Sequence, residues 1–188
     1  IKSLIRKREA QSAYRFCGVD DGNAYFLDLP FYKTGKAQKK PISEDDIKKV
    51  KELIQEIKPH QIFVAGDQSD PHGTHQKCLQ IFKTAFQEII DEGQKWIKDC
   101  WVWQYRGAWL EWPIDQIEMV VPLSPDEVAK KRSAIVKHVS QKNGGVFPGD
   151  DLREFWERVE DRNRNTAELY NKLGLPEYQA AEAFKRLK

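Results

Sequence analysis

The sequence lacks the features that mark two large classes of protein. No apolar run approaches the roughly 20 residues that a membrane-spanning helix needs, and no apolar core of a signal peptide is visible. Basic residues do not predominate either, because 31 Lys and Arg stand against 29 Asp and Glu and leave a net charge of +2. A protein that neutralises many phosphates normally carries a clear basic excess. We therefore expect neither a membrane protein nor a nucleic-acid binder.

Cysteine is also scarce. The three cysteines, Cys17, Cys78 and Cys100, are odd in number, lie far apart and have no metal-ligand spacing. This pattern fits a reduced cytoplasmic protein better than a disulfide scaffold, and we expect all three thiols to lie in the core.

Two further absences concern the ends of the chain and its loops. No glycine-rich motif of the Walker or dinucleotide-binding type is present. The chain begins Ile1-Lys2-Ser3, without an initiator Met. We therefore expect this sequence to be a piece of a longer polypeptide.

What the sequence does contain predicts a folded α/β protein. Its 188 residues are 40% apolar and 11% aromatic, enough for the core of one domain. Helical spacing of apolar residues predicts helices over residues 3–17, 43–58, 76–92, 124–141, 152–173 and 178–187. Short apolar runs predict strands over residues 23–29, 61–66, 101–105 and 117–121. The run 61–66 follows a helix and does not alternate, which predicts a strand buried on both faces of a parallel sheet.

The segment after that strand, residues 66–75, is the candidate functional site. It holds two histidines and two aspartates within ten residues, and in α/β folds ligands bind at the carboxyl ends of strands. Imidazole nitrogen and carboxylate oxygen are ligand types that suit a divalent ion such as zinc. The alternative is a surface turn rich in Asp, Pro and Gly with two solvated histidines.

At this segment the sequence resembles a known family. Asp70-Pro71-His72-Gly73-Thr74-His75 looks like the second metal motif of the PIG-L/LmbE-type zinc-dependent N-deacetylases, commonly Asp-Pro-His-Gly-Asp-His. Three further stretches agree in order and spacing: residues 6–19, an Arg-rich helix; residues 26–30, a strand; and residues 131–141, which contain His138-Val139-Ser140-Gln141. The tail, with Phe155-Trp156, resembles the C-terminal part of bacterial glucosamine-6-phosphate deaminase-like fusion proteins.

The resemblance implies a fold and a domain organisation. We expect an α/β, three-layer sandwich around a mainly parallel Rossmann-like sheet that lacks its N-terminal portion. Residues 1–150 would form the deacetylase-like domain, truncated at its N-terminus, and residues 151–188 a helical C-terminal extension of it.

The resemblance also assigns roles. His75 matches the family's histidine zinc ligand, and His72 the histidine that stabilises the developing oxyanion. Asp70 would hold a histidine ring by a hydrogen bond. Arg6 matches an arginine that binds substrate, with Arg8 as the alternative match. Zinc in such a site lowers the pKa of a bound water and polarises the amide carbonyl.

One departure from the family pattern limits these roles. The first motif, His-Pro-Asp-Asp, supplies two of three zinc ligands and the general base, and it does not occur here. We therefore expect zinc in the complete protein and none bound by this chain alone. His138 is a candidate replacement ligand, although a histidine that lies on a helix surface or forms a hydrogen bond explains it better.

Two functions compete on this basis. The first is a zinc-dependent hydrolase, an N-deacetylase, acting on an N-acetylated amino sugar or conjugate. The second is a non-catalytic or regulatory domain fused to a glucosamine-6-phosphate deaminase/isomerase. The expected partners are an amino-sugar small molecule and either a fused deaminase-like domain or a second copy of the chain. The tryptophans at 101, 103, 109 and 112 are candidates for stacking on sugar rings, although strand-core packing explains alternate ones.

Overall fold

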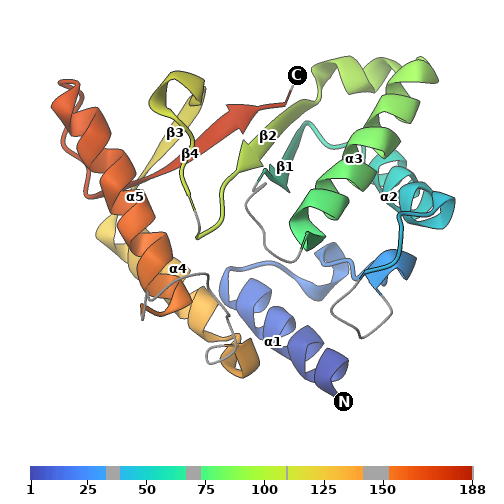
Figure 1. Ribbon diagram of the computed structural model, residues 1–188, viewed down its shortest axis with the longest axis horizontal. Coiled ribbons are helices and arrows are strands. Elements are labelled where there is room, and N and C mark those ends of the chain that lie inside the picture. The colour runs from blue at the N-terminus through green and yellow to red at the C-terminus, as the bar shows by residue number, and fades with distance from the viewer. Residues whose placement is uncertain (33–38, 67–72, 109, 142–152, 188) are drawn as a thin grey trace. The chain divides into compact units, whose positions relative to one another are not determined.

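The computed structural model describes residues 1–32, 39–66, 73–108, 110–141 and 153–187 (Figure 1). Five α-helices and four strands are found in this described part, joined by short 3-10 turns. The chain divides into two compact units that alternate along the sequence. One unit comprises residues 1–25 and 120–183, and the other residues 26–119 and 184–188.

The second unit contains a parallel strand pair covered by two helices. β1 (Gln61–Ala65) and β2 (Trp101–Tyr105) pair in parallel, with Phe63 opposite Trp103. α2 (Glu44–Ile57) and α3 (Thr74–Asp91) lie side by side next to β1 (Figure 1). The buried core between helices and strands is Ile54, Leu79, Phe82, Ile89, Ile97 and Val102.

The start of α2 shows how local sequence sets an element. Ser43 is the N-cap: its hydroxyl oxygen accepts the backbone N–H of Asp46, and the Asp46 carboxylate accepts the N–H of Ser43 in return. Three acidic residues in the first turn interact favourably with the positive end of the helix dipole. α4 (Pro125–Val136) begins in the same way at Ser124, with Glu127 as the reciprocal acceptor. Each serine is followed three positions later by an acidic residue, which is the local sequence pattern of a capping box.

The sheet is open and mixed, with strand order β1-β2-β4-β3. β4 (Ala180–Arg186) pairs antiparallel to β2, while β3 (Met119–Leu123) is the other neighbour of β4. The predicted α/β class is confirmed, but the expectation of a mainly parallel sheet is met only in part, since β1 and β2 are parallel whereas β2 and β4 are antiparallel. The burial expected on both faces of β1 is wrong, because Phe63 is 47% exposed and packs edge-on against Phe184.

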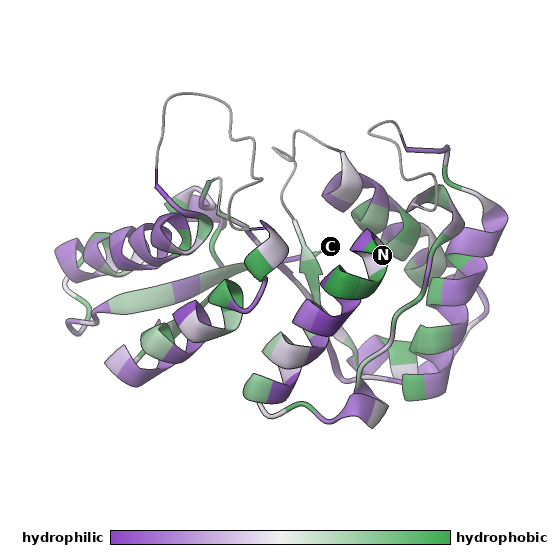
Figure 2. Ribbon diagram, turned by 90° about the horizontal axis from the view of Figure 1, so that it is seen from below, coloured by the Kyte–Doolittle hydropathy of each residue, from purple (hydrophilic) through white to green (hydrophobic). Residues whose placement is uncertain are grey.

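Several polar contacts link the elements of the first unit. It contains α1 (Lys2–Phe16), α4 and α5 (Phe155–Lys172), and the hydropathy colouring of Figure 2 shows a predominantly hydrophilic α5. Arg132 of α4 forms an ion pair with Glu160 of α5, whose side chain is nearly fully buried. Asn163, 1% exposed, donates a hydrogen bond of 2.7 Å to the carbonyl oxygen of Ala181 in β4. The buried Glu160 and Asn163 thus have protein partners, as burial requires.

Three local predictions are wrong. Residues 180–186 of the predicted helix 178–187 form β4, so the C-terminal extension is not wholly helical. Residues 23–29 form no strand: a 3-10 turn at Asp21–Asn23 and a stretch without regular secondary structure precede another 3-10 turn at Pro30–Tyr32. Cys17 and Cys78 are exposed and only Cys100 is half-buried, so the cysteines are not all core residues. The division at residue 150 stays a prediction, since residues 142–152 lie outside the described part.

The helices of the described residues were also compared with the requirements of a membrane span. None combines the necessary length with a sufficiently apolar stretch.

Candidate functional site

The carboxyl end of β1 is closely packed around a glycine. Gly66 follows the last residue of β1, and its N–H donates a hydrogen bond of 2.8 Å to the carbonyl oxygen of Tyr105. A Cβ at this position would stand 2.8 Å from the Cβ of Gln104 and 2.8 Å from Cζ2 of Trp112. Real Cβ atoms do not approach other carbons so closely, so glycine is the residue that fits here.

The predicted metal motif begins after Gly66, and the structure describes part of it. Asp70 and His72 lie outside the described residues. Gly73 is the N-cap of α3 and has a φ of +62°, a left-handed conformation that glycine adopts without strain. His75 lies in the first turn of α3 and is exposed. The one predicted zinc ligand of the motif therefore lies at the start of a helix, just after the carboxyl end of a parallel strand.

Zinc binding needs more ligands than this part of the chain brings together. Nowhere among the described residues do three His, Cys, Asp or Glu side chains gather closely enough to hold a metal ion. A catalytic zinc takes three protein ligands and one water. The described residues alone therefore do not fit zinc, and any complete ligand set must draw on residues beyond them.

The predicted substrate arginine belongs to the first unit, where it lies on α1. Arg6 is half-buried, and its Nε atom is buried without a hydrogen-bond partner among the described residues. One turn later on the same helix, the Glu9 carboxylate accepts hydrogen bonds from the backbone N–H of Ser140 at 2.6 Å and from its hydroxyl at 2.7 Å. Beside Ser140, the Nε2 atom of Gln141 lies 3.4 Å from the Nδ1 atom of His138. The structure thus joins two sequence-predicted stretches, the Arg6 helix and residues 138–141.

The Glu9–Ser140 contact has an electrostatic consequence. The two hydrogen bonds from Ser140 hold the pKa of Glu9 below its ordinary value, with smaller contributions from the charges of His138 and Arg6. Glu9 is therefore a stable anion that fixes α1 against the turn that follows α4. This matters because α1 has no fully buried residue among its own fifteen.

Sequence reasoning missed two cationic residues that contact Trp112 near the end of β2. The guanidinium carbon of Arg106 lies 4.7 Å from the centre of the Trp112 ring, and the Nζ atom of Lys185 lies 5.6 Å from it. Trp112 was a candidate for sugar stacking, but its ring is 9% exposed and is covered by these neighbours. Lys185 was assigned to a helix, which hid its place opposite Gln104 in the sheet.

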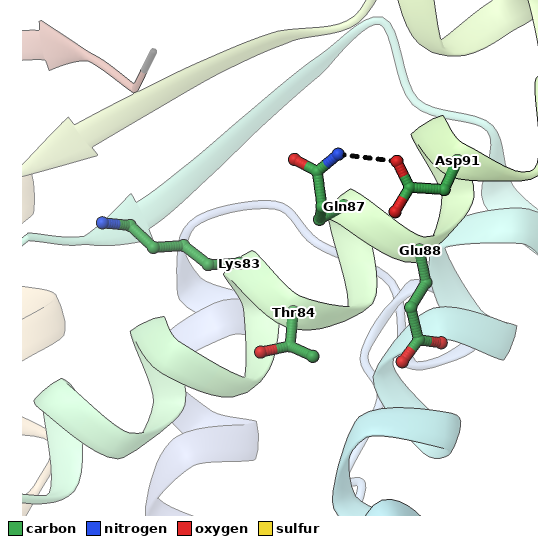
Figure 3. A pocket seen from close by; sticks show the side chains of 5 residues that line it. All are labelled: Lys83, Thr84, Gln87, Glu88 and Asp91. Atoms are coloured by element: carbon green, nitrogen blue, oxygen red, sulfur yellow. Dashed lines mark hydrogen bonds between the residues drawn. The ribbon is translucent and has the colours of Figure 1, made fainter.

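A separate hollow lies on the second half of α3. Figure 3 shows its five lining side chains, with Gln87 donating a hydrogen bond of 2.9 Å to Asp91. Glu88, which also lines it, pairs with Lys51 at 2.8 Å. The hollow is formed by one helix, and three of its five lining side chains already have polar partners. We therefore assign it no role in the candidate site.

Comparison with known proteins gives one close relative. The chain is 55% identical over 184 residues to a glucosamine-6-phosphate deaminase-like protein of Bacteroides thetaiotaomicron. The match covers 98% of this chain but spans only 28% of the length of the relative. No protein-family profile matches the chain. The predicted resemblance to deaminase-like proteins is confirmed.

Solved structures share the fold at low sequence identity. GalB, the 4-carboxy-2-hydroxymuconate hydratase of Pseudomonas putida, superposes with a TM-score of 0.67 at 14% identity. The match covers 98% of this chain and 71% of the GalB chain. The conserved protein TT1542 of Thermus thermophilus gives 0.61 at 17% identity, over 97% and 72%. The zinc-inhibited form of teicoplanin deacetylase Orf2 gives 0.56 at 16% identity, over 98% and 75%. These likenesses establish the fold that this chain shares with a deacetylase of the predicted kind.

Proposed function

We propose that this chain forms part of a zinc-dependent hydrolase that removes the acetyl group from an N-acetylated amino sugar or its conjugate. The observation that carries the proposal is the position of His75, in the first turn of the helix that follows β1. Ligands of α/β folds bind at the carboxyl ends of parallel strands, and β1 is one of a parallel pair. The fold shared with a teicoplanin deacetylase and the deaminase-like relative both support a hydrolase of amino-sugar compounds.

The proposal assigns a role to each predicted site residue. His75 is a zinc ligand, His72 stabilises the oxyanion, and Asp70 orients a histidine. Arg6 binds the substrate, and its buried Nε donor still lacks an acceptor among the described residues, which a bound substrate would supply. The remaining zinc ligands and the general base come from sequence outside this chain.

One observation favours a second candidate, a non-catalytic domain beside a glucosamine-6-phosphate deaminase. The relative is a glucosamine-6-phosphate deaminase-like protein, and the match with this chain spans only 28% of its length, which leaves room for a separate deaminase-like part. The two candidates differ in the histidines that they need: the hydrolase needs His72 and His75, and the non-catalytic domain needs neither.

The test uses the full-length natural protein and measures acetate released from N-acetylated amino sugars, with and without zinc. His75→Ala should abolish zinc-dependent release. His72→Ala should slow turnover by about 100- to 1000-fold, as expected for a lost oxyanion donor. His60→Ala is the matched control, because His60 is exposed just before β1 and should leave the rate unchanged. Wild-type rates in both His72 and His75 variants would end the hydrolase proposal.

A further inference from the structure

One face of the sheet in the second unit is lined by aromatic side chains. Because successive side chains of a strand point to opposite faces, alternate residues of β1, β2 and β4 share a face. The strand register places Phe63 opposite Trp103, and Tyr105 opposite Phe184. Trp101 lies two residues before Trp103 on β2 and therefore on the same face. We call this surface the aromatic face; all of its residues belong to one compact unit.

The two faces of these strands differ in what covers them. Val102 is buried in the core together with residues of α2 and α3, and Ile62 and Val64 pack against the same core. The two helices therefore cover one face of the sheet. On the aromatic face, in contrast, Phe63 is 47% exposed and Trp101 is 45% exposed.

The rings of the aromatic face form a contiguous patch. Phe63 and Phe184 meet edge to face, with ring centres 5.3 Å apart, across the strand that lies between them. Trp101 and Trp103 are stacked with ring centres 5.9 Å apart. Single exposed apolar residues are normal on a protein surface, but a contiguous apolar patch marks an interaction surface.

β1 also has an open edge. Among the strands of the described residues, β1 has β2 as its one neighbour. The carbonyl oxygen of His60 and the N–H of Gly66 bond to the β2 segment, at 2.9 and 2.8 Å. In a parallel ladder alternate residues bond to the same neighbour, so three residues direct their backbone groups away from β2: Gln61, Phe63 and Ala65. β1 contains no charged residue and no proline, which are the devices that keep natural edge strands from further pairing.

The handedness of strand connections relates the open edge to the aromatic face. The chain runs from β1 through α3 to its parallel neighbour β2, and α3 packs on the helix-covered face. Connections between parallel strands of one sheet are almost always right-handed. A right-handed connection that runs the other way along the sheet, away from β2, places its helix on the opposite face. A parallel strand that pairs with β1 and continues away from β2 therefore brings its helix over the aromatic face.

The aromatic face also carries an exposed cation. Arg186 lies opposite Trp103 in the register, and its guanidinium carbon stands 3.9 Å from the centre of the Trp101 ring. Arg186 is exposed, so a partner can reach its guanidinium group. A guanidinium that rests on an aromatic ring still offers paired N–H donors to a carboxylate. An occupant of this face is therefore expected to combine apolar side chains with an acidic one.

From these observations we infer that the aromatic face and the open edge of β1 form a docking surface for a strand–helix segment of the full-length protein outside this chain. The strand pairs with β1, and the helix lays an apolar stripe on the aromatic face and offers a carboxylate to Arg186. The match with the deaminase-like relative spans only 28% of its length, so more than two thirds of the relative is available to supply such a segment. The inference goes beyond the proposed function, because neither zinc nor substrate enters it.

The test uses the full-length natural protein with the photo-crosslinking amino acid p-benzoylphenylalanine in place of Phe63. Irradiation should link position 63 to a peptide from outside residues 1–188, identified by mass spectrometry, while the product keeps the mass of a single chain on a denaturing gel. The same amino acid in place of Lys83, an exposed residue of α3, should not link to that peptide. Circular dichroism verifies folding, and Tyr105, 38% exposed, is the second crosslinking position if the Phe63 variant does not fold.

Hydrogen exchange of the unmodified full-length protein tests the strand pairing separately. The N–H of Phe63 points to the open edge, so pairing should slow its exchange at least about tenfold relative to the unfolded protein. An unprotected Phe63 N–H would overturn the pairing. Links from position 63 only to residues 1–188 of the same chain, a covalent dimer on the gel, or no link from either crosslinking position would overturn the docking surface.

Discussion

At the scale of single residues, Gly66 is the position where the structure most clearly requires glycine. In Gly66→Ala, the new methyl group would stand 2.8 Å from Gln104 and Trp112, so one of them must move. Overpacking of this kind costs about 1–3 kcal/mol, and we expect the free energy of unfolding to fall by that amount. Gly22→Ala is the control, because a Cβ there meets nothing within 4 Å and the change should stay within about 0.5 kcal/mol. Urea unfolding measures both; equal stabilities would refute the close packing.

Glu9 supplies a prediction about pH. Because its pKa is lower folded than unfolded, the contact with Ser140 stabilises the fold fully above the unfolded pKa and is lost as the pH falls through the folded pKa. Ser140→Ala removes the hydroxyl donor, so the pKa of Glu9 should rise toward its ordinary value. NMR titration of the Glu9 carboxyl carbon gives this pKa directly. Ser12→Ala, an exposed serine on the same helix, should leave it unchanged; a pKa unmoved by Ser140→Ala would contradict the contact.

Single residues were predictable where neighbouring residues in the sequence determine their conformation or role. The glycine at the end of an apolar run marks the strand end, and the motif at 70–75 marks the candidate site. The tryptophan that fills the space over Gly66 comes 46 positions later in the numbering, and nothing local connects the two. Lys185 was hidden for the same reason, since its neighbour Trp112 is close only in the folded chain.

At the scale of elements, helix starts were the most predictable features. Ser43 and Ser124 each precede an acidic residue by three positions, and a capping box needs only that local pattern. β2 likewise has the predicted bounds, Trp101–Tyr105. β4 was missed because Ala, Glu, Lys and Arg favour helices, whereas tertiary contacts determine its state. Pairing with β2 and the hydrogen bond from Asn163 to Ala181 exist only in the folded protein.

The two capping boxes differ in burial, which gives a comparative prediction. The Asp46 carboxylate is fully buried and also accepts the N–H of Phe31 at 3.1 Å, whereas Glu127 is exposed. Asp46→Ala leaves buried donors unsatisfied and should cost about 2–4 kcal/mol. Glu127→Ala should cost at most about 1 kcal/mol. Chemical denaturation of the two variants compares them; equal losses would mean that Asp46 acts only as a cap.

The pKa of Asp46 should fit the same account. Burial alone raises its pKa, but the hydrogen bonds from Ser43 and Phe31 lower it more, so the pKa lies below its ordinary value. Asp46 therefore stabilises the fold above the unfolded pKa, and this contribution disappears as the pH falls through the folded value. The stability of Asp46→Ala should accordingly depend less on pH in the acidic range than that of the wild type.

At the scale of the whole molecule, the alternation of helices and strands was enough to predict the α/β class, but not a mixed sheet. Strand direction depends on which segments pair, and the pairing of β2 with β4 joins residues about 80 positions apart. The candidate site at residues 66–75 stays a prediction. Metal ligands can be placed from a motif, but a complete ligand set requires residues that the fold brings together from distant segments.

The central claim is that His75 holds a catalytic zinc in the full-length protein, and the most direct test is the zinc bound per chain. Inductively coupled plasma mass spectrometry of the purified full-length protein, after dialysis against zinc-free buffer, measures it for the wild type, His75→Ala and His60→Ala. We predict close to one zinc per chain in the wild type and in His60→Ala, and a large loss in His75→Ala. The same zinc content in His75→Ala as in the wild type would contradict the claim.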